Sequence, residues 1–342
     1  MVLFAAEPMA EPMSAAAPPE ISFVIPVFNK ADVLPHVIRA LAAQQPAPDA
    51  EYIFVDDASS DTSVAVLEQA GDLLPAMTVL RNTANAGPSV RLNQGAALAR
   101  GRLLCLIDAD ELIAPDAVAL MRQAMQQHDA DMVHGKVIRS ALPAAQLVPA
   151  PLGTMPACTV GDRPLQTILH GRGFVRMAWL IDTALFRAAG GCDERLFIQD
   201  ESLPLRLAVK ARRMIDFRGG MSHAPQAATH LSADKRQQHH DRFFAYYNLL
   251  RDQPDLPAAE RRLLVATCVS TAWKAVRRSG LPLAQIAALG AYLRSKAGLD
   301  VSPHFLDRAA AAFRGMPGIR HAAAAPHQVP QSQKQPQSSS AS

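Results

Sequence analysis

The 342-residue sequence lacks several features that would assign it to a common class. It has no run of eighteen apolar residues, so we expect no membrane-spanning helix. Its four cysteines lie far apart and without Cys-x-x-Cys spacing, which favours reduced cytosolic thiols over a disulfide framework or a zinc site. Residues 1–20 have no basic segment and carry Glu7 and Glu11, so we interpret them as a flexible leader and not as a secretory signal.

Glycine-rich phosphate loops are also missing. The sequence has no Gly-x-Gly-x-x-Gly and no Gly-Lys-Ser/Thr, so it supports neither a dinucleotide fold nor a P-loop ATPase. It does have 49% hydrophobic residues, enough for one large domain or for a domain with an appendage. Any phosphate must therefore be held by something other than a glycine cradle.

Charge is distributed unevenly, although the net charge is only +3. Residues 1–135 contain 7 Lys and Arg against 17 Asp and Glu, whereas residues 205–278 contain 14 against 6. The acidic part resembles a metal site, and the basic part suits a phosphate-rich surface. The alternative is that both are ordinary solvated helix faces.

Strands and helices alternate in the first third of the chain. Each apolar run is followed by a helical pattern at intervals typical of right-handed βαβ units with parallel strands. The predicted strands are 21–27, 52–55, 77–80 and 103–107, and the predicted helices are 31–45, 62–70 and 88–100.

Polar residues follow three of these strands. They are Phe28-Asn29, Asp56-Asp57 and Asp108-Ala109-Asp110. The carboxyl ends of parallel strands form the ligand crevice of open α/β sheets, so we expect these side chains at one site. Two aspartates at that edge suit a divalent cation bound to a phosphate. The alternative is a solvated acidic turn before the next helix, which starts near Pro115.

Six sequence blocks follow one another along the chain, at residues 26–29, 55–61, 85–95, 106–111, 190–194 and 197–206. In order and spacing they resemble those of family 2 glycosyltransferases. The resemblance covers about 21–232 and implies the GT-A fold, a Rossmann-like mixed α/β sheet flanked by helices, here with a C-terminal helical extension.

The resemblance implies a nucleotide pocket at the first three blocks. Pro26, Phe28 and Asn29 would line the base and ribose pocket, Asp57 would accept a hydrogen bond from the nucleobase, and Arg91 would approach the sugar or diphosphate. Phe28 is alternatively a core residue, and Arg91 a surface ion pair of small energetic value.

The same resemblance implies a Mn²⁺ or Mg²⁺ cofactor at the Asp-x-Asp pair. Asp110 would coordinate the metal, and Asp108 would contact the metal, its water or the ribose. His223 and His230 are candidates for a third ligand, although a lone histidine is more often structural.

The general base is expected in the last block. Counting back from Arg206 aligns Asp200 with the base of the family, and Glu201 is a substitute or helper. Gln199 replaces the usual Glu. A carboxylate here would take the proton of the acceptor hydroxyl, a contribution of roughly 10² to 10⁴ in rate. Asp200 is alternatively only a helix cap.

The remaining sequence divides the chain. We predict a leader at 1–20, the glycosyltransferase domain at 21–232, a helical region at 233–315 and a disordered tail at 316–342. Trp179 either stacks on an acceptor sugar or belongs to the core. The helix at 256–279 either packs on its neighbours or lies on an anionic membrane.

The predicted function is inverting transfer of a sugar from a nucleoside-diphosphate sugar to a hydroxyl. UDP is favoured over GDP or dTDP as the carrier, and a glycan, polysaccharide or lipid-linked acceptor is expected, with no nucleic acid. The expected location is the cytoplasm, with peripheral contact with the inner membrane surface as a further hypothesis. The alternatives are a sugar-phosphate nucleotidyltransferase and a catalytically impaired nucleotide-sugar-binding protein.

Overall fold

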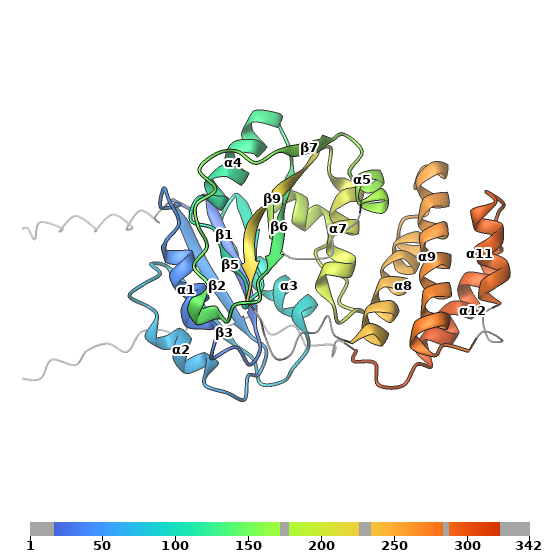
Figure 1. Ribbon diagram of the computed structural model, residues 1–342, viewed down its shortest axis with the longest axis horizontal. Coiled ribbons are helices and arrows are strands. Elements are labelled where there is room, and N and C mark those ends of the chain that lie inside the picture. Colours follow the sequence, from blue (N-terminus) through green and yellow to red (C-terminus); the bar gives the residue numbers. More distant parts are fainter. Residues whose placement is uncertain (1–16, 172–177, 226–233, 283–286, 322–342) are drawn as a thin grey trace, which may run out of the picture.

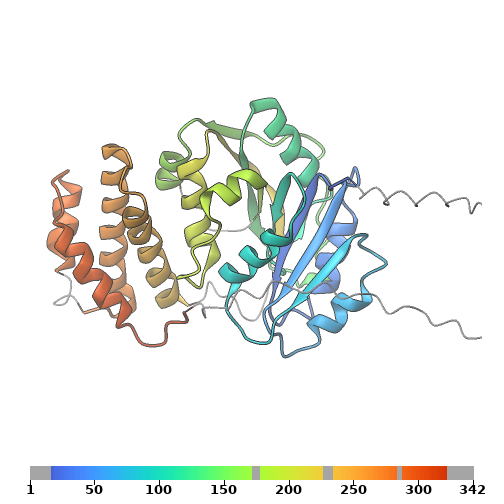
Figure 2. The same ribbon diagram turned by 180° about the vertical axis from the view of Figure 1, so that it is seen from behind.

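The computed structural model describes residues 17–171, 178–225, 234–282 and 287–321. Within them, helices cover both faces of a mixed nine-stranded sheet, and further helices stack beyond one face (Figures 1 and 2). The strands are β1 (Ile21–Val27), β2 (Ala50–Asp56), β3 (Met77–Arg81), β4 (Leu103–Leu106), β5 (Leu112–Ile113), β6 (Met132–Arg139), β7 (Cys158–Gly161), β8 (Trp179–Asp182) and β9 (Met214–Ala224).

The helices follow the strands in the first part of the chain and stand alone in the last part. They are α1 (Leu34–Ala42), α2 (Ser63–Gln69), α3 (Pro88–Leu98), α4 (Ala117–His128), α5 (Pro164–His170), α6 (Thr183–Ala189), α7 (Gln199–Lys210), α8 (Lys235–Asp252), α9 (Ala258–Ser279), α11 (Ala288–Lys296) and α12 (Pro303–Arg314), with a 3₁₀ turn at Ala144–Gln146.

The sheet is parallel in one half and mixed in the other. Its order is β3-β2-β1-β4-β8-β6-β9-β5, with β7 paired to β9. The first four strands in this order are parallel, as the βαβ rhythm predicts. β8 runs antiparallel to β4 and β6. The carboxyl ends of β1, β2 and β4 therefore meet at one edge of the sheet.

Helices cover strand β1 on both faces of the sheet. Ile21, Phe23 and Ile25 pack with α1 and α4 on one face of the sheet, whereas Val24 packs with α3 and α7 on the other. All four side chains are buried. A strand covered on both faces favours apolar residues on both, so the run does not alternate. Ser22 is the exception: it is buried, and its hydroxyl donates a hydrogen bond to Glu51 at 2.7 Å.

Local signals set several helix ends. The side chain of Asp182 accepts hydrogen bonds from the amides of Ala184 and Leu185 and so caps α6, which ends at Gly190 with φ of 72°. The helix predicted at 31–45 is shorter in the structure, where α1 covers Leu34–Ala42. Pro35 lies in its first turn, where a missing backbone N–H costs no hydrogen bond.

The C-terminal helices stack outward from α7 in the order α8, α9 and α11 (Figure 1). On α9, Leu264 and Val269 are fully buried and Trp273 stacks on Tyr292. These apolar side chains pack on their neighbours, which favours the first of the two interpretations of this helix. No described helix is long and apolar enough to cross a membrane.

Parts of the predicted helical region and of the predicted tail lie outside the described residues. In the helical region these include residues 283–286, and α11 begins just after them, at Ala288. Most of the predicted tail, 322–342, also lies outside the described residues.

Candidate functional site

A cavity of about 1220 Å³ lies at the carboxyl ends of β1, β2 and β4. The beginning of α7 and the first turns of α8 contribute to its wall. Most of the residues that the sequence predicts for the site line this one cavity. They are Pro26, Phe28, Asn29, Asp57, Asp108, Asp110, Asp200 and Glu201.

At the end of β1, Phe28 and Asn29 form one side of the cavity. Phe28 is 43% exposed, so it is not a core residue. The Asn29 side-chain oxygen accepts a hydrogen bond from the Ser60 amide at 2.8 Å, and the Asn29 amide donates to the Ser59 hydroxyl at 3.0 Å. Asn29 thus joins the loops after β1 and β2 and holds their shape.

Asp57 is tied to the loop before α3. Its carboxylate accepts hydrogen bonds from the amides of Ala86 at 2.8 Å and Gly87 at 2.9 Å, and from Arg91 Nε at 2.6 Å. The Arg91 side chain is 3% exposed and does not line the cavity. Arg91 is therefore neither a surface ion pair nor a residue that reaches into the cavity. It binds the Asp57 carboxylate from a buried position outside the cavity lining.

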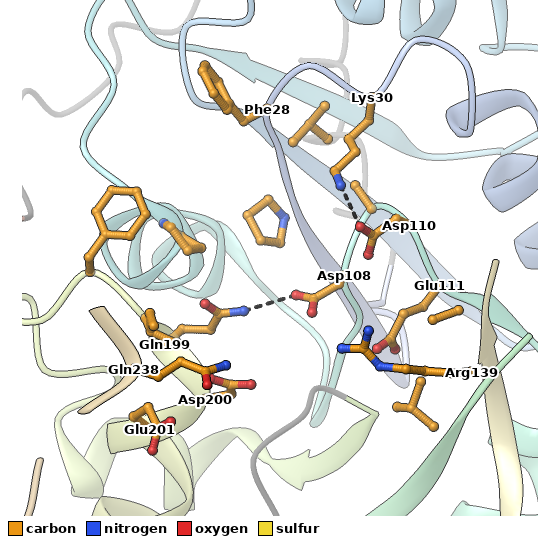
Figure 3. A pocket seen from close by; sticks show the side chains of 18 of the residues that line it. Phe28, Lys30, Asp108, Asp110, Glu111, Arg139, Gln199, Asp200, Glu201 and Gln238 are labelled. Atoms are coloured by element: carbon orange, nitrogen blue, oxygen red, sulfur yellow. Dashed lines mark hydrogen bonds and ion pairs between the residues drawn. The ribbon is translucent and has the colours of Figure 1, made fainter. Parts of the chain in front are cut away.

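The two aspartates after β4 differ in their surroundings. Lys30 forms an ion pair with Asp110, and Gln199 Nε2 donates a hydrogen bond to Asp108 Oδ1 at 3.0 Å (Figure 3). Burial and then the charge of Asp110 raise the pKa of Asp108 to about 7. The neighbouring Glu111 is buried and accepts a hydrogen bond from the Ser222 hydroxyl at 3.0 Å, so it ties β9 to this turn.

Asp200 lies in the first turn of α7 and faces the same cavity (Figure 3). Ile198 occupies the cap position and no side chain caps this helix, so Asp200 is not a cap. Asp200 Oδ1 is buried and has no hydrogen-bond partner among the described residues. Burial, followed by the charges of Glu201 and Asp108, raises the pKa of Asp200. A carboxylate with an unused oxygen and a raised pKa is a stronger proton acceptor than an ordinary exposed aspartate.

The donor set fits a divalent cation that also binds a phosphate. Mg²⁺ is commonly held by one or two carboxylates together with substrate phosphates, and Asp108 and Asp110 supply two. Among the residues that the structure describes, no three His, Cys, Asp or Glu side chains gather to hold a metal. His223 lies on β9 but does not line the cavity, and burial lowers its pKa. His230 lies outside the described residues.

Several lining residues were missed by sequence reasoning. Lys30 follows Asn29 directly and carried a signal, since a cation next to an acidic site is a natural partner. The others come from β6, β9, α8 and the segment after α12, where no motif marks them. They are His134, Lys136, Arg139, Asp216, Arg218, Lys235, Gln238, Arg242 and Arg320. Trp179, by contrast, is fully buried and belongs to the core.

Solved glycosyltransferase structures match this fold. S. aureus TarS 1–349, in complex with UDP-GlcNAc, has a TM-score of 0.64 at 16% sequence identity and covers 86% of this chain and 90% of its own. The mannosyltransferase PcManGT from Pyrobaculum calidifontis, in complex with GDP-Man and Mn²⁺, has a TM-score of 0.50 at 17% identity, over 88% of this chain and 89% of its own. The chain has the GT-A fold that the resemblance implies.

Sequence comparisons show similarity to the same family over part of the chain. Residues 22–177 match the model described as Glycosyl transferase family 2. The poly(ribitol-phosphate) beta-glucosyltransferase of Bacillus spizizenii is 31% identical over 120 residues, which are 34% of this chain and 19% of that protein. The succinoglycan biosynthesis protein ExoO of Rhizobium meliloti is 28% identical over 148 residues, 41% of each. The chain thus spans less than half the length of these two relatives. Residues 22–177 are thus similar to family 2 glycosyltransferases.

Proposed function

We propose that this protein transfers a sugar from a nucleoside-diphosphate sugar to an acceptor hydroxyl, with inversion at the anomeric carbon. One observation carries the proposal. The aspartates after β4 and Asp200 of α7 line the same cavity, and the Gln199–Asp108 hydrogen bond joins the two acidic groups. A donor sugar held between them would have its diphosphate on one side and the proton acceptor on the other.

The nucleotide is proposed to lie at the ends of β1 and β2. The Phe28 ring is exposed, and Pro26 lines the cavity beside it. Asn29 fixes the shape of the loop through its hydrogen bond from the Ser60 amide. Asp57 is the proposed acceptor of a nucleobase hydrogen bond, and Arg91 contributes by holding Asp57. UDP is the favoured carrier because TarS structures contain UDP-GlcNAc or UDP, with GDP as the next candidate from PcManGT.

Asp110 and Asp108 are the proposed ligands of Mn²⁺ or Mg²⁺. When bound, the cation neutralises the negative charge that develops on the departing diphosphate. Lys30 pairs with Asp110 and lines the same wall, so it adds a positive charge near the diphosphate. We propose no third protein ligand, because the diphosphate and water can complete the coordination.

Asp200 is the proposed general base. Its unpartnered oxygen accepts the proton of the acceptor hydroxyl while the new C–O bond forms and the bond to the diphosphate breaks. Attack from the face opposite to the leaving group inverts the configuration at the anomeric carbon. Holding donor and acceptor together in one cavity supplies part of the remaining acceleration.

The proposal also includes an acceptor and a location. A glycan or lipid-linked acceptor fits the polysaccharide-related names of the relatives. The proposed location is the cytoplasm. Contact with an anionic membrane would involve the exposed Lys274, Arg277 and Arg278 of α9. Flotation with anionic liposomes that shows no salt-sensitive binding would remove the membrane part.

A panel of nucleotide sugars with Mn²⁺ and Mg²⁺ tests the proposal. A donor that binds should raise the melting temperature by mass action, and the free nucleotide should be released slowly by hydrolysis. Asp110→Asn is expected to lower metal-dependent turnover by about 10² to 10³, and Asp200→Asn to lower turnover by roughly 10² to 10⁴ while donor binding is kept. Full activity in both variants would contradict the assignments. Pyrophosphate release from a nucleoside triphosphate and a sugar phosphate would instead favour a nucleotidyltransferase.

A further inference from the structure

Two adjacent residues of α8 hold the segment that carries Asp200 from both sides. Asp241 Oδ2 accepts a hydrogen bond from the Ile198 amide at 2.8 Å. Arg242 donates two hydrogen bonds to Glu201, from Nε at 2.8 Å and from Nη2 at 2.7 Å. Ile198 and Glu201 flank Gln199 and Asp200, so both ends of this pair are fixed by one helix.

Asp241 is a buried acid with a full set of partners. Its side chain is 0% exposed. Besides the Ile198 amide, its carboxylate accepts a hydrogen bond from Gln237 Nε2 at 3.0 Å, and its Oδ1 lies 2.7 Å from His240 Nδ1. Burying a carboxylate costs little free energy of folding only when its oxygens accept hydrogen bonds. This network therefore keeps the Ile198 amide in one place.

Arg242 acts on the other side through a planar, two-bond contact. The Glu201 side chain is 3% exposed, and burial raises its pKa while Arg242 opposes that effect. Removing the guanidinium would leave a buried carboxylate beside Asp200 without a counter-charge. A lysine would keep the charge but lose the two-bond geometry.

The helix that makes these contacts lies outside the family match, which ends at residue 177. Lys235, Gln238 and Arg242 of α8 line the same cavity as Asp200. The C-terminal helices are therefore in contact with the reacting end of the cavity through α8.

We propose that Asp241 and Arg242 are positioning residues for the general base: they fix the first turn of α7 so that Asp200 meets the acceptor hydroxyl. This inference depends on the proposed function, because it takes Asp200 as the proton acceptor. It adds to that function two residues of the helical region, neither of which needs to touch the substrate.

The test uses the full-length chain and the variants Arg242→Met, Arg242→Lys and Asp241→Asn. Hydrolysis of UDP-GlcNAc, UDP-glucose and GDP-mannose is measured with Mn²⁺, and kcat and KM are compared for the donor that the wild type hydrolyses fastest. Arg251→Met is the matched control, because Arg251 lies on the same helix and pairs with Asp307 away from the cavity.

The expected result is a loss in kcat without a change in KM. Arg242→Met should lower kcat by up to about 100-fold, the size of effect that a misplaced catalytic group produces. Arg242→Lys should fall between Arg242→Met and the wild type, and Arg251→Met should match the wild type. Since Arg242 acts through Glu201, the double variant Glu201→Gln with Arg242→Met should be no slower than Arg242→Met alone.

Hydrogen exchange gives a second readout that needs no turnover. In Asp241→Asn, the amides of residues 196–203 should exchange faster than in the wild type, while those of α9 should not change. This measurement covers the case in which a variant folds but loses all activity.

Different failures have different meanings. A higher KM with unchanged kcat in Arg242→Met would mean that Arg242 binds the donor directly and would overturn the inference. Unchanged kcat and unchanged exchange would overturn it as well. A wild type that neither binds nor hydrolyses a nucleotide sugar would remove the proposed function, and with it the base that these residues are inferred to position.

Discussion

Gln199 stands at the point where the two acidic groups of the cavity meet. Its amide donates to Asp108, whereas the usual Glu of the family would bring a third carboxylate to the same place. The neutral side chain therefore reduces repulsion among acids that are buried or half-buried. It leaves its own Oε1 without a partner among the described residues, so one hydrogen-bond acceptor remains open to a ligand.

Replacing Gln199 by Glu should make the protein depend more on the cation. Two like charges at hydrogen-bond distance repel by about 1 to 4 kcal/mol in a partly solvated site, so the metal-free variant should melt below the wild type. A bound divalent cation would relieve this repulsion. The rise in melting temperature on adding Mn²⁺ should therefore be larger in Gln199→Glu than in the wild type, and a smaller rise would contradict this interpretation.

Gly87 has a backbone conformation that other residues avoid. Its φ is 89° and its ψ is 160°, and a Cβ atom there would lie 2.8 Å from the ring of Phe197. Gly87→Ala should destabilise the fold by about 1 to 3 kcal/mol, measured by urea unfolding. Gly71→Ala is the control, because no atom lies within 4 Å of its added Cβ. Equal stability of the two variants would show that the strain is absent.

The helix α8 connects α7 to the other C-terminal helices. Its Phe243 ring is fully buried and stacks on Phe313 of α12 with 4.3 Å between ring centroids. Phe243→Ala should cost about 3 to 5 kcal/mol in the free energy of unfolding, because the lost ring leaves a cavity. Leu299→Ala, at a residue that is 53% exposed, should change little. A cost below about 1 kcal/mol for Phe243→Ala would mean that α12 does not depend on this contact.

The same helix should make stability depend on pH through His239. Burial, followed by the positive charges of Arg242, Arg278, Lys274 and Lys235, lowers the pKa of His239 from 6.5 to about 4. Because the unfolded chain binds this proton more readily, the stabilisation is complete above pH 6.5 and is lost as the pH falls from about 6.5 to about 4. Urea unfolding at pH 7.5 and pH 4.5 should show a smaller difference in His239→Gln than in the wild type. An equal difference would contradict the assignment.

At the scale of the whole molecule, one hydrophobic core joins the sheet to the helical region. It extends from Val24 of β1 through α3 and α7 to Phe313 of α12. The boundary between residues 232 and 233 remains a proposal made from the sequence. Because the two regions share one core, we expect them to unfold together. Calorimetry should show one transition, and two well-separated transitions would mean that the helices fold on their own.

Reasoning from the sequence placed the acidic cavity but not all of its walls. The ends of β1, β2 and β4 were predicted, and they meet at one edge because parallel strands align their carboxyl ends. The contribution of α8 was missed, since no local pattern links Arg242 to Glu201, which lies 41 positions earlier. Arg91 was expected near the sugar or diphosphate. The structure shows that it is buried and that it pairs with Asp57 without lining the cavity.

The amino-acid sequence by itself determined the strands, the polar residues that follow them and the order of the family blocks, because these depend on neighbours along the chain. Tertiary structure alone decided that β8 enters the sheet between β4 and β6, that Trp179 is core, and that α8 contacts the segment that carries Asp200. Such contacts depend on how large apolar faces pack together. That information is spread over the whole chain and is not carried by any single motif.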